Sequence, residues 1–258
     1  MELRDRVIVI TGASSGFGEA IARHCAKAGA IVVLAARSAA KLEQLADELG
    51  AGAGRALAVP TDVSRAEDVA RLAAVTLKRF GRADVLVNNA GFGVLDRFAD
   101  ARFADLREMI DVNLYGAVRC TQAFLPHMLR RRSGQIVIMA SLAGLIASVN
   151  MSFYTASKFA LVGLARTLML ELEGTGVRCA LICPGVAATG FQNRADIRKY
   201  SRITRIVGVS TAQVARAAVR VIARNTYGEV ILPWQARPLV AIGSAFPGLA
   251  RMVLRIVG

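Results

Sequence analysis

The chain has 258 residues, 54% of them hydrophobic and 20% charged, and its formal net charge at pH 7 is +14. That composition excludes a disordered chain, and the length suits one large domain that buries a substantial core. Residues 1–6 carry charges where a secretory signal needs an apolar run, and no uncharged apolar stretch reaches the roughly 18 residues of a membrane span, so a cytoplasmic protein is expected.

The positive charge resembles that of nucleic-acid-binding proteins. Its densest groups, residues 130–132 and 194–205, carry neither interleaved aromatic residues nor a base-reading motif. We therefore expect a solvated basic face and no specific nucleic-acid partner. The cysteines lie in apolar runs without the spacing of zinc ligands, which predicts reduced core thiols and no metal site; they are Cys25, Cys120, Cys179 and Cys183.

Strand and helix patterns alternate along the chain without internal repeats or a linker. This rhythm predicts a doubly wound α/β fold, in which helices cover both faces of a parallel sheet. The predicted strands are 7–10, 31–35, 55–59, 85–88, 135–140, 177–182 and 229–232. The predicted helices are 16–28, 39–49, 65–80, 103–130, 155–172 and 212–224. One domain is expected over 1–235, followed by an apolar and basic helical tail over 236–258.

The first predicted strand leads directly into a glycine-rich turn and then a helix. Glycines in such a turn allow the backbone to approach a pyrophosphate, which the helix N-terminus then faces. The turn lacks the Gly-Lys-Ser/Thr of a P-loop, which disfavours a triphosphate hydrolase. An ordinary β-α connection is the alternative. We favour a dinucleotide site formed by Gly12, Ser14, Ser15, Gly16, Phe17 and Gly18.

The end of the second predicted strand indicates which dinucleotide is bound. A dehydrogenase that prefers NAD usually has an acid there, about 20 residues beyond the glycines, whereas this chain has Arg37. The guanidinium of Arg37 can pair with a 2′-phosphate, so NADP(H) is the expected cofactor and NAD(H) the alternative. Arg37 has a second interpretation, as one exposed arginine among many in a basic protein.

Tyr154 and Lys158 lie four residues apart in a helical pattern, so their side chains leave the same face with Cβ atoms about 5–6 Å apart. We expect the ammonium to lower the pKa of the phenol, which makes Tyr154 a candidate general acid or base. Ser141 follows the fifth predicted strand, at the edge where open α/β sheets bind ligands, and is placed to hydrogen-bond a substrate oxygen. Without this context, a surface helix pair would explain a Tyr-x-x-x-Lys sequence.

Several separated motifs together resemble the short-chain dehydrogenase/reductase family over about residues 5 to 235. They are Thr11-Gly12-x-x-x-Gly16-x-Gly18, Asn88-Asn89-Ala90-Gly91, Asn113, Ser141 with Tyr154-x-x-x-Lys158, and Pro184-Gly185 with Thr189. The resemblance implies an oxidoreductase that interconverts a carbonyl and a secondary alcohol with NAD(P). It also implies that Tyr154 transfers the proton and that Lys158 lowers its pKa and binds the nicotinamide ribose. Ser141 would orient the carbonyl, and Asn113 would position a water that links the lysine to solvent.

The resemblance implies further contacts with the cofactor and between subunits. Asp62 and Val63 are expected at the adenine, and residues Asn89, Ala90 and Gly91 at the adenine ribose. The nicotinamide amide is expected at Pro184, Gly185, Val186 and Thr189. The helical segments 103–130 and 155–172 resemble those that pair subunits in the family, so a homodimer or homotetramer is expected.

Apolar segments indicate the substrate class. The expected pocket residues are Phe92, Val94, Leu142, Leu145, Val149 and Phe191. Their apolar character favours a lipophilic carbonyl or alcohol, steroid-, retinoid- or fatty-acyl-like. Basic residues within 194–205 leave open a 3-oxoacyl substrate on an anionic carrier. A non-catalytic NADP(H)-binding sensor on the same fold is the remaining alternative.

The end of the chain carries an apolar stripe at spacings of three and four: Leu239, Ile242, Phe246, Leu249, Val253 and Ile256. Arg237, Arg251 and Arg255 flank it. Such a stripe can lie on a membrane surface, where apolar depth and arginine attraction act together, which would make the protein membrane-associated. It can also pack against a second subunit or cover the substrate mouth.

Overall fold

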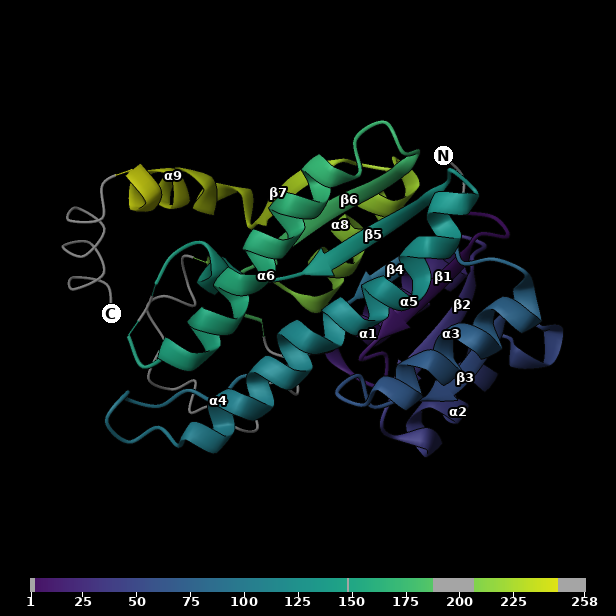
Figure 1. The fold of residues 1–258 in the computed structure, drawn as a ribbon, viewed down its shortest axis with the longest axis horizontal. Helices are drawn as coiled ribbons and strands as arrows, with labels where there is room; N and C mark the ends of the chain where they lie inside the picture. The colour runs from purple at the N-terminus through teal and green to yellow at the C-terminus, as the bar shows by residue number, and fades with distance from the viewer. Residues whose placement is uncertain (1–2, 148, 188–206, 246–258) are drawn as a thin grey trace.

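A computed structural model describes residues 3–147, 149–187 and 207–245 (Figure 1). Within these residues one parallel sheet has the strand order β3-β2-β1-β4-β5-β6-β7. The strands are β1 Val7–Thr11, β2 Ile31–Ala36, β3 Ala56–Pro60, β4 Val85–Asn88, β5 Gly134–Met139, β6 Val177–Pro184 and β7 Gly228–Leu232. Each predicted strand is confirmed, with bounds that differ by no more than two residues.

Helices cover both faces of this sheet, as predicted (Figure 1). One face packs against α1 Gly16–Lys27, α2 Ala39–Glu48 and α8 Thr211–Ala223; the other packs against α3 Ala66–Phe80, α5 Gly116–Arg130 and α6 Ser152–Glu171. A short 3-10 helix, η1 Ala51–Ala53, follows α2. The two faces form because successive side chains of a strand alternate: Val9 joins the core under α5, whereas Ile10 joins the core under α1.

The four cysteines lie in these cores as free, buried thiols, which confirms their expected packing role. Burial raises the pKa of each thiol to about 12. These thiols are therefore protonated near neutral pH and act as small apolar side chains.

The predicted single helix 103–130 consists of α4 Phe103–Met109, a π-helical segment η2 Ile110–Tyr115, and α5. A π segment contains an additional residue per turn, which shifts the side chains that follow it around the axis. Close packing fixes its end, since a Cβ at Gly116 would lie 2.6 Å from Val63 Cγ2. Asn113 lies within this segment and is almost fully buried.

The strand order reverses between β1 and β4, because the chain proceeds from β1 to β2 and β3 on one side and from β4 to β7 on the other. Val9 pairs with Val33 of β2 on one side and with Leu86 of β4 on the other. In open α/β sheets, ligands bind outside the carboxyl ends of the strands at this point. The glycine turn follows β1 there, and Asn89 follows β4.

The chain continues from β7 into η6 Trp234–Ala236 and α9 Arg237–Ala245. In the first turn of the predicted tail stripe, Leu239 is half-buried and Ile242 is 40% exposed, whereas Ala236 and Val240, which are not members of the stripe, join the core. The chain leaves β7 in a direction that packs the Val240 side chain against the main core. The rest of the predicted stripe lies outside the described residues. Among the helices described, none is both long and apolar enough to cross a membrane.

Candidate active site

The glycine turn after β1 is built for close backbone approach. Gly12 has a φ of +66°, and a Cβ there would lie 2.8 Å from Ala90 Cα. A Cβ at Gly18 would overlap the carbonyl oxygen of Gly12. Only glycine fits these two positions, and the Ser15 side chain does not cap the start of α1 at Gly16. The turn therefore fits the pyrophosphate of a dinucleotide, the group expected at the helix N-terminus.

Hydrogen bonds from the neighbouring strand hold this turn in place. The Thr11 hydroxyl oxygen accepts from the backbone N–H groups of Asn89 and Ala90, each at 3.0 Å. The amide Nδ2 of Asn89 donates to the carbonyl oxygens of Thr11 at 2.9 Å and Gly12 at 3.3 Å. Asn89 was expected only beside the adenine ribose. Its side chain ties the segment after β4 to the glycine turn, and Thr11 is a site residue that the sequence analysis did not single out for a role.

The residues expected around the adenosine lie near the carboxyl ends of β2 and β3. Arg37 follows the last residue of β2 and is exposed. The Asp62 carboxylate accepts from the backbone N–H of Ser64 at 2.9 Å and from its hydroxyl at 2.7 Å, which makes a tight turn. Val63 is buried, with its side chain against the start of α5. This geometry presents Asp62 at the edge of the sheet and gives Val63 a packing role.

Tyr154 and Lys158 are brought together on α6, as the sequence predicts. Both are buried, at 6% and 5% exposure, and Lys158 Nζ lies 5.7 Å from the centroid of the Tyr154 ring. Lys158 Nζ also donates to the Met139 carbonyl oxygen at 3.2 Å. Gly144 permits this close packing, because a Cβ there would lie 2.7 Å from the Lys158 carbonyl oxygen.

Ser141 lies two residues beyond the end of β5 and begins the short 3-10 helix η3 Leu142–Gly144. Its hydroxyl oxygen accepts from the Ala143 backbone N–H at 3.1 Å, which fixes the side chain. The same hydroxyl hydrogen-bonds with the Tyr154 phenol. The two hydroxyls therefore converge on one point, as two groups that bind a single carbonyl oxygen must.

Burial governs the protonation of these residues in the protein alone. It raises the pKa of the Tyr154 phenol to about 12, and the hydrogen bond with Ser141 opposes that rise. It lowers the pKa of the Lys158 ammonium to about 8. The expected lowering of the Tyr154 pKa is therefore wrong in direction here, because loss of solvation outweighs every other effect on the phenol. At neutral pH Tyr154 is protonated and can act as an acid.

Asn113 uses its side chain to join three parts of the site. Its Oδ1 accepts from the Phe92 backbone N–H, and its Nδ2 donates to the Phe92 carbonyl oxygen, both at 2.9 Å. Nδ2 also donates to the Ser157 hydroxyl at 3.0 Å. A Cβ at Gly91 would lie 3.0 Å from Asn113 Oδ1 and 3.4 Å from Lys158 Nζ. The π segment thus places Asn113 against the turn after β4 and close to the ammonium.

Ser157 is a second residue that the sequence analysis did not identify. It is fully buried, and its hydroxyl donates to the Tyr154 carbonyl oxygen at 2.7 Å while accepting from Asn113. The sequence contains a signal for the first bond, since a serine three residues after Tyr154 in a helix can reach back to that carbonyl. It contains none for the second bond, which depends on the π segment.

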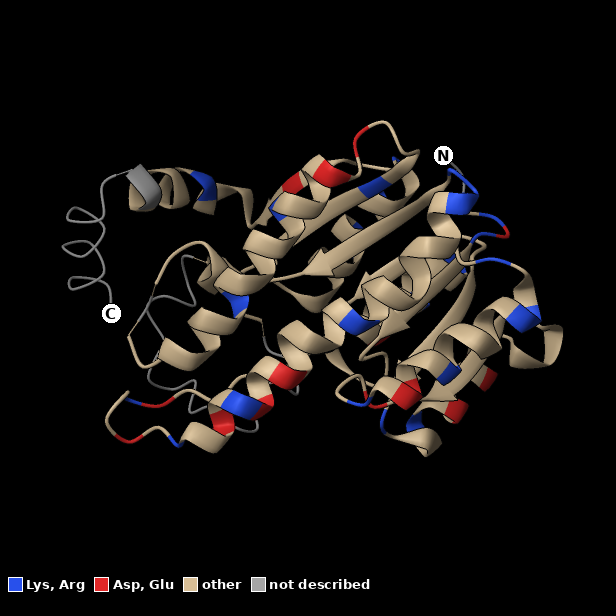
Figure 2. Ribbon diagram, in the orientation of Figure 1, with Lys and Arg blue, Asp and Glu red and all other residues tan. Residues whose placement is uncertain are grey.

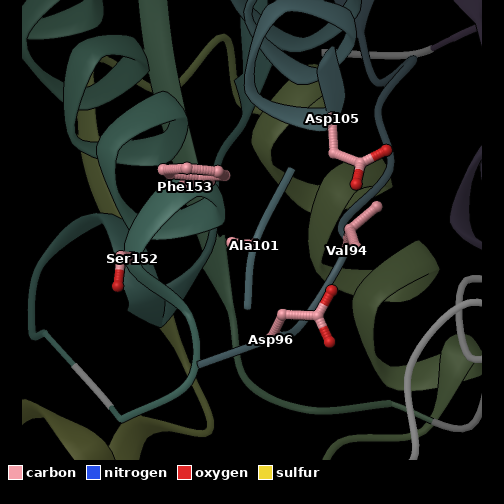
Figure 3. Close-up of a pocket in the computed structure, with 6 residues that line it drawn as sticks. All are labelled: Val94, Asp96, Ala101, Asp105, Ser152 and Phe153. Atoms are coloured by element: carbon pink, nitrogen blue, oxygen red, sulfur yellow. The ribbon is translucent and has the colours of Figure 1, made fainter. Parts of the chain in front are cut away.

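The expected substrate residues fall into two groups. Phe92 and Val94 pack with Leu95, Met109, Ala143, Met151 and Phe153 in an apolar cluster that includes Tyr154. Val94 and Phe153 also line a pocket beside the start of α6, with Asp96, Ala101, Asp105 and Ser152 (Figure 3). By contrast, Leu142 and Leu145 are buried in the main core, and Val149 is 61% exposed. Phe191 lies outside the described residues.

The segment expected at the nicotinamide amide follows β6, at the same edge of the sheet. Pro184 ends the strand, and a Cβ at Gly185 would overlap the Val207 carbonyl oxygen. Val186 forms an isolated parallel bridge with Gly208. Gly185 therefore allows two separate segments to meet beside Leu142, the residue after Ser141. Thr189 lies outside the described residues.

Comparisons with known proteins agree with this geometry. The family model described as short chain dehydrogenase matches residues 6–200. Ketoacyl reductase HetN from Nostoc sp. is 38% identical over 232 residues, which cover 89% of this chain and 79% of that protein. Oxidoreductase UcpA from Salmonella typhimurium is 41% identical over 189 residues, which cover 73% of this chain and 72% of that protein.

Two solved structures share the fold. A short-chain dehydrogenase/reductase from Burkholderia phymatum in complex with NAD aligns with a TM-score of 0.87, at 31% identity over 96% of each chain. An alcohol dehydrogenase from the archaeon Thermococcus sibiricus complexed with 5-hydroxy-NADP aligns with a TM-score of 0.78, at 33% identity over 89% of this chain and 96% of that one. The chain therefore belongs to the short-chain dehydrogenase/reductase family and is an oxidoreductase acting on CH–OH and C=O groups.

Proposed function

We propose that the chain uses NADP(H) to interconvert a lipophilic ketone and a secondary alcohol. The observation that carries this proposal is the meeting of the Ser141 hydroxyl, the Tyr154 phenol and the Lys158 ammonium. Tyr154 belongs to an apolar cluster, and Lys158 lies close to the turn after β4, which is tied to a glycine turn that fits a dinucleotide. A proton donor, a carbonyl-binding hydroxyl and a cofactor site are the parts that this reaction requires.

The side chains have distinct roles in carbonyl reduction. The hydroxyls of Ser141 and Tyr154 bind and orient the carbonyl oxygen, and bound nicotinamide supplies the hydride to the carbonyl carbon. Tyr154 then gives its proton to the oxygen on which negative charge develops. Lys158 stabilises the resulting phenolate by its charge, and Asn113 fixes the turn that lies beside the ammonium.

Arg37 supports NADP(H) as the preferred cofactor. Its exposed guanidinium follows β2, where a 2′-phosphate can pair with it. The structural relatives include one complex with NAD and one with 5-hydroxy-NADP, so residue 37 has to be tested directly. Fluorescence titration should show tighter binding of NADPH than of NADH, and Arg37→Asp should reverse the order. Arg107→Asp, at another exposed arginine on α4, should leave it unchanged.

The apolar cluster around Tyr154 supports a lipophilic substrate. Aromatic and aliphatic side chains approach the phenol from the loop after β4, from α4 and from the start of α6. Such a lining binds a hydrocarbon skeleton better than a sugar or a small acid. Loss of NADPH absorbance with steroid-, retinoid- and fatty-acyl-like ketones tests the substrate class. Faster turnover of hydrophilic ketones than of these lipophilic ketones would reject the proposed substrate class.

Reduction of a carrier-bound 3-oxoacyl group is the second candidate. It is favoured by the similarity to a relative named as a ketoacyl reductase. Turnover of a 3-oxoacyl thioester on acyl-carrier protein or coenzyme A, with no turnover of free ketones, would select this function. Tight NADPH binding with no turnover of either class would select a non-catalytic sensor.

We also propose that subunits pair through α5 and α6. Phe159 and Leu170 on α6 are 45% and 68% exposed, and large apolar side chains at such exposure suit a subunit interface. Size-exclusion chromatography with light scattering should give a dimer or tetramer mass. A monomer mass would reject this assembly.

A further inference from the structure

The two sides of α9 differ in what they contact. Ala236, just before the helix, and Val240 are buried against the main core. On the opposite side, Arg237, Pro238, Ala241 and Ile242 are exposed, at positions that share one face of a helix. Trp234, in η6, is 67% exposed. We call Trp234, Arg237, Pro238, Ala241 and Ile242 the outer face of α9.

The outer face combines apolar side chains with positive charge. Its charged member is Arg237, and α9 carries no acidic residue (Figure 2). From Trp234 to Gly258 the sequence contains Arg237, Arg251 and Arg255 and neither Asp nor Glu. A tryptophan has an apolar ring and a polar N–H, which suits the boundary between lipid headgroups and acyl chains.

We infer that the outer face of α9 docks on the surface of an anionic phospholipid bilayer. Trp234 and Ile242 would enter the boundary between headgroups and acyl chains, while Arg237 pairs with phosphate or other anionic headgroups. Charge disfavours a second copy of the chain as the occupant. Two copies would bring the same arginines together without a carboxylate from this segment, in a protein of net charge +14.

Another exposed apolar pair provides a contrast. Phe98 and Phe103 are 71% and 67% exposed, but residues 96–105 carry three aspartates against two arginines, whereas the outer face of α9 has no acidic residue. Acidic side chains are repelled by anionic headgroups. The outer face of α9 therefore has both exposed apolar side chains and positive charge without acidic residues, as an anionic bilayer requires. The Phe98 and Phe103 region has only the exposed apolar side chains.

Docking through α9 would also orient the enzyme. The helix follows the carboxyl end of β7, and all strands of the sheet are parallel, so α9 lies at the edge that carries the glycine turn and Ser141. The ligand-binding edge would then be held near the bilayer, where a lipophilic carbonyl is concentrated. The docking itself does not depend on the proposed substrate and can be tested without turnover.

Co-sedimentation of the full-length protein with vesicles tests the inference. Binding is expected to vesicles of phosphatidylcholine with phosphatidylglycerol, to be much weaker to pure phosphatidylcholine, and to fall as salt rises. Arg237→Gln should weaken binding roughly fivefold, the effect expected for one arginine near an anionic surface. Ile242→Asp should weaken it about tenfold or more, because it replaces an inserted apolar group with a repelled charge.

Matched controls identify the surface. Val75→Asp on α3, a site 36% exposed, and Arg107→Gln on α4 should leave vesicle binding unchanged. The inference would be overturned if the wild-type protein did not sediment with anionic vesicles. It would also be overturned if the Arg237→Gln and Ile242→Asp variants bound these vesicles as tightly as wild type. A changed mass of the lipid-free Ile242→Asp protein in light scattering would instead place a second copy on this face and overturn it.

Discussion

Lys158 is held as a buried ammonium, and this arrangement has a measurable cost to the stability of the cofactor-free fold. The residue is 5% exposed, and its pKa is lowered from 10.5 to about 8 by burial. At about 1.4 kcal/mol for each unit of pKa, protonated Lys158 destabilises the fold by roughly 3 kcal/mol relative to neutral Lys158. We predict that Lys158→Met, which keeps the volume and removes the charge, stabilises the cofactor-free protein at pH 7 by on the order of 1–3 kcal/mol.

The pH dependence gives this prediction its sign. Because the folded-state pKa lies below the unfolded-state value, the unfolded chain binds more protons between pH 8 and 10.5. The destabilisation is complete below pH 8 and disappears as the pH rises towards 10.5. The stability advantage of Lys158→Met should therefore shrink across this window. The buried thiols oppose that trend in wild type, because their pKa is raised, so the difference between the two proteins is the informative quantity.

Urea unfolding of both proteins at pH values from 7 to 10 would measure this difference. Lys78→Met on α3 is a matched control at an exposed lysine and should change stability by less than about 0.5 kcal/mol at every pH. The reasoning is refuted if Lys158→Met is less stable than wild type at pH 7 by several kcal/mol, or if its advantage stays constant with pH.

Two further substitutions test the site, and a third tests the opposite edge of the sheet. Gly18→Ala would place a Cβ on the Gly12 carbonyl oxygen and should lower dinucleotide affinity by about 100-fold or more in titration, whereas Gly163→Ala on α6 meets open space and should be neutral or stabilising. Ser157→Ala removes the bridge between Asn113 and Tyr154. It should lower the free energy of unfolding in urea by about 1–2 kcal/mol, and it should lower kcat while changing KM less. Asp84→Ala should cost about 2–3 kcal/mol in thermal unfolding, because Asp84 accepts from the Val7 N–H and pairs with Arg82 and Arg131. These expectations would be contradicted by unchanged dinucleotide affinity in Gly18→Ala, unchanged kcat in Ser157→Ala, or unchanged thermal stability in Asp84→Ala.

Local sequence patterns predict the sheet and the glycine turn because each is encoded within a few residues. Alternating apolar strands and helices identify the fold, and glycines at positions 12, 16 and 18 directly after the first strand mark the turn. The pairing of Tyr154 with Lys158 also follows from a helical spacing of four. These features need no knowledge of distant contacts.

Contacts between distant segments explain what the sequence does not predict. The bonds from Thr11 to Asn89 and from Asn113 to Phe92 join residues 78 and 21 positions apart. The raised pKa of Tyr154 depends on burial by several elements, and a lone Tyr-x-x-x-Lys pattern shows only the neighbouring charge. Likewise, the path of the chain from β7 decides that Val240, and not Leu239, enters the core at α9.

Turnover by the Tyr154→Phe variant tests the central claim most directly. Consumption of NADPH would be followed with the best ketone found for the wild-type protein, alongside the dissociation constant for NADPH. Loss of the phenolic proton should lower kcat by about 100-fold or more while NADPH affinity changes little, because the phenyl ring remains in its place. A variant that keeps near wild-type turnover would contradict the assignment of Tyr154 as the proton donor.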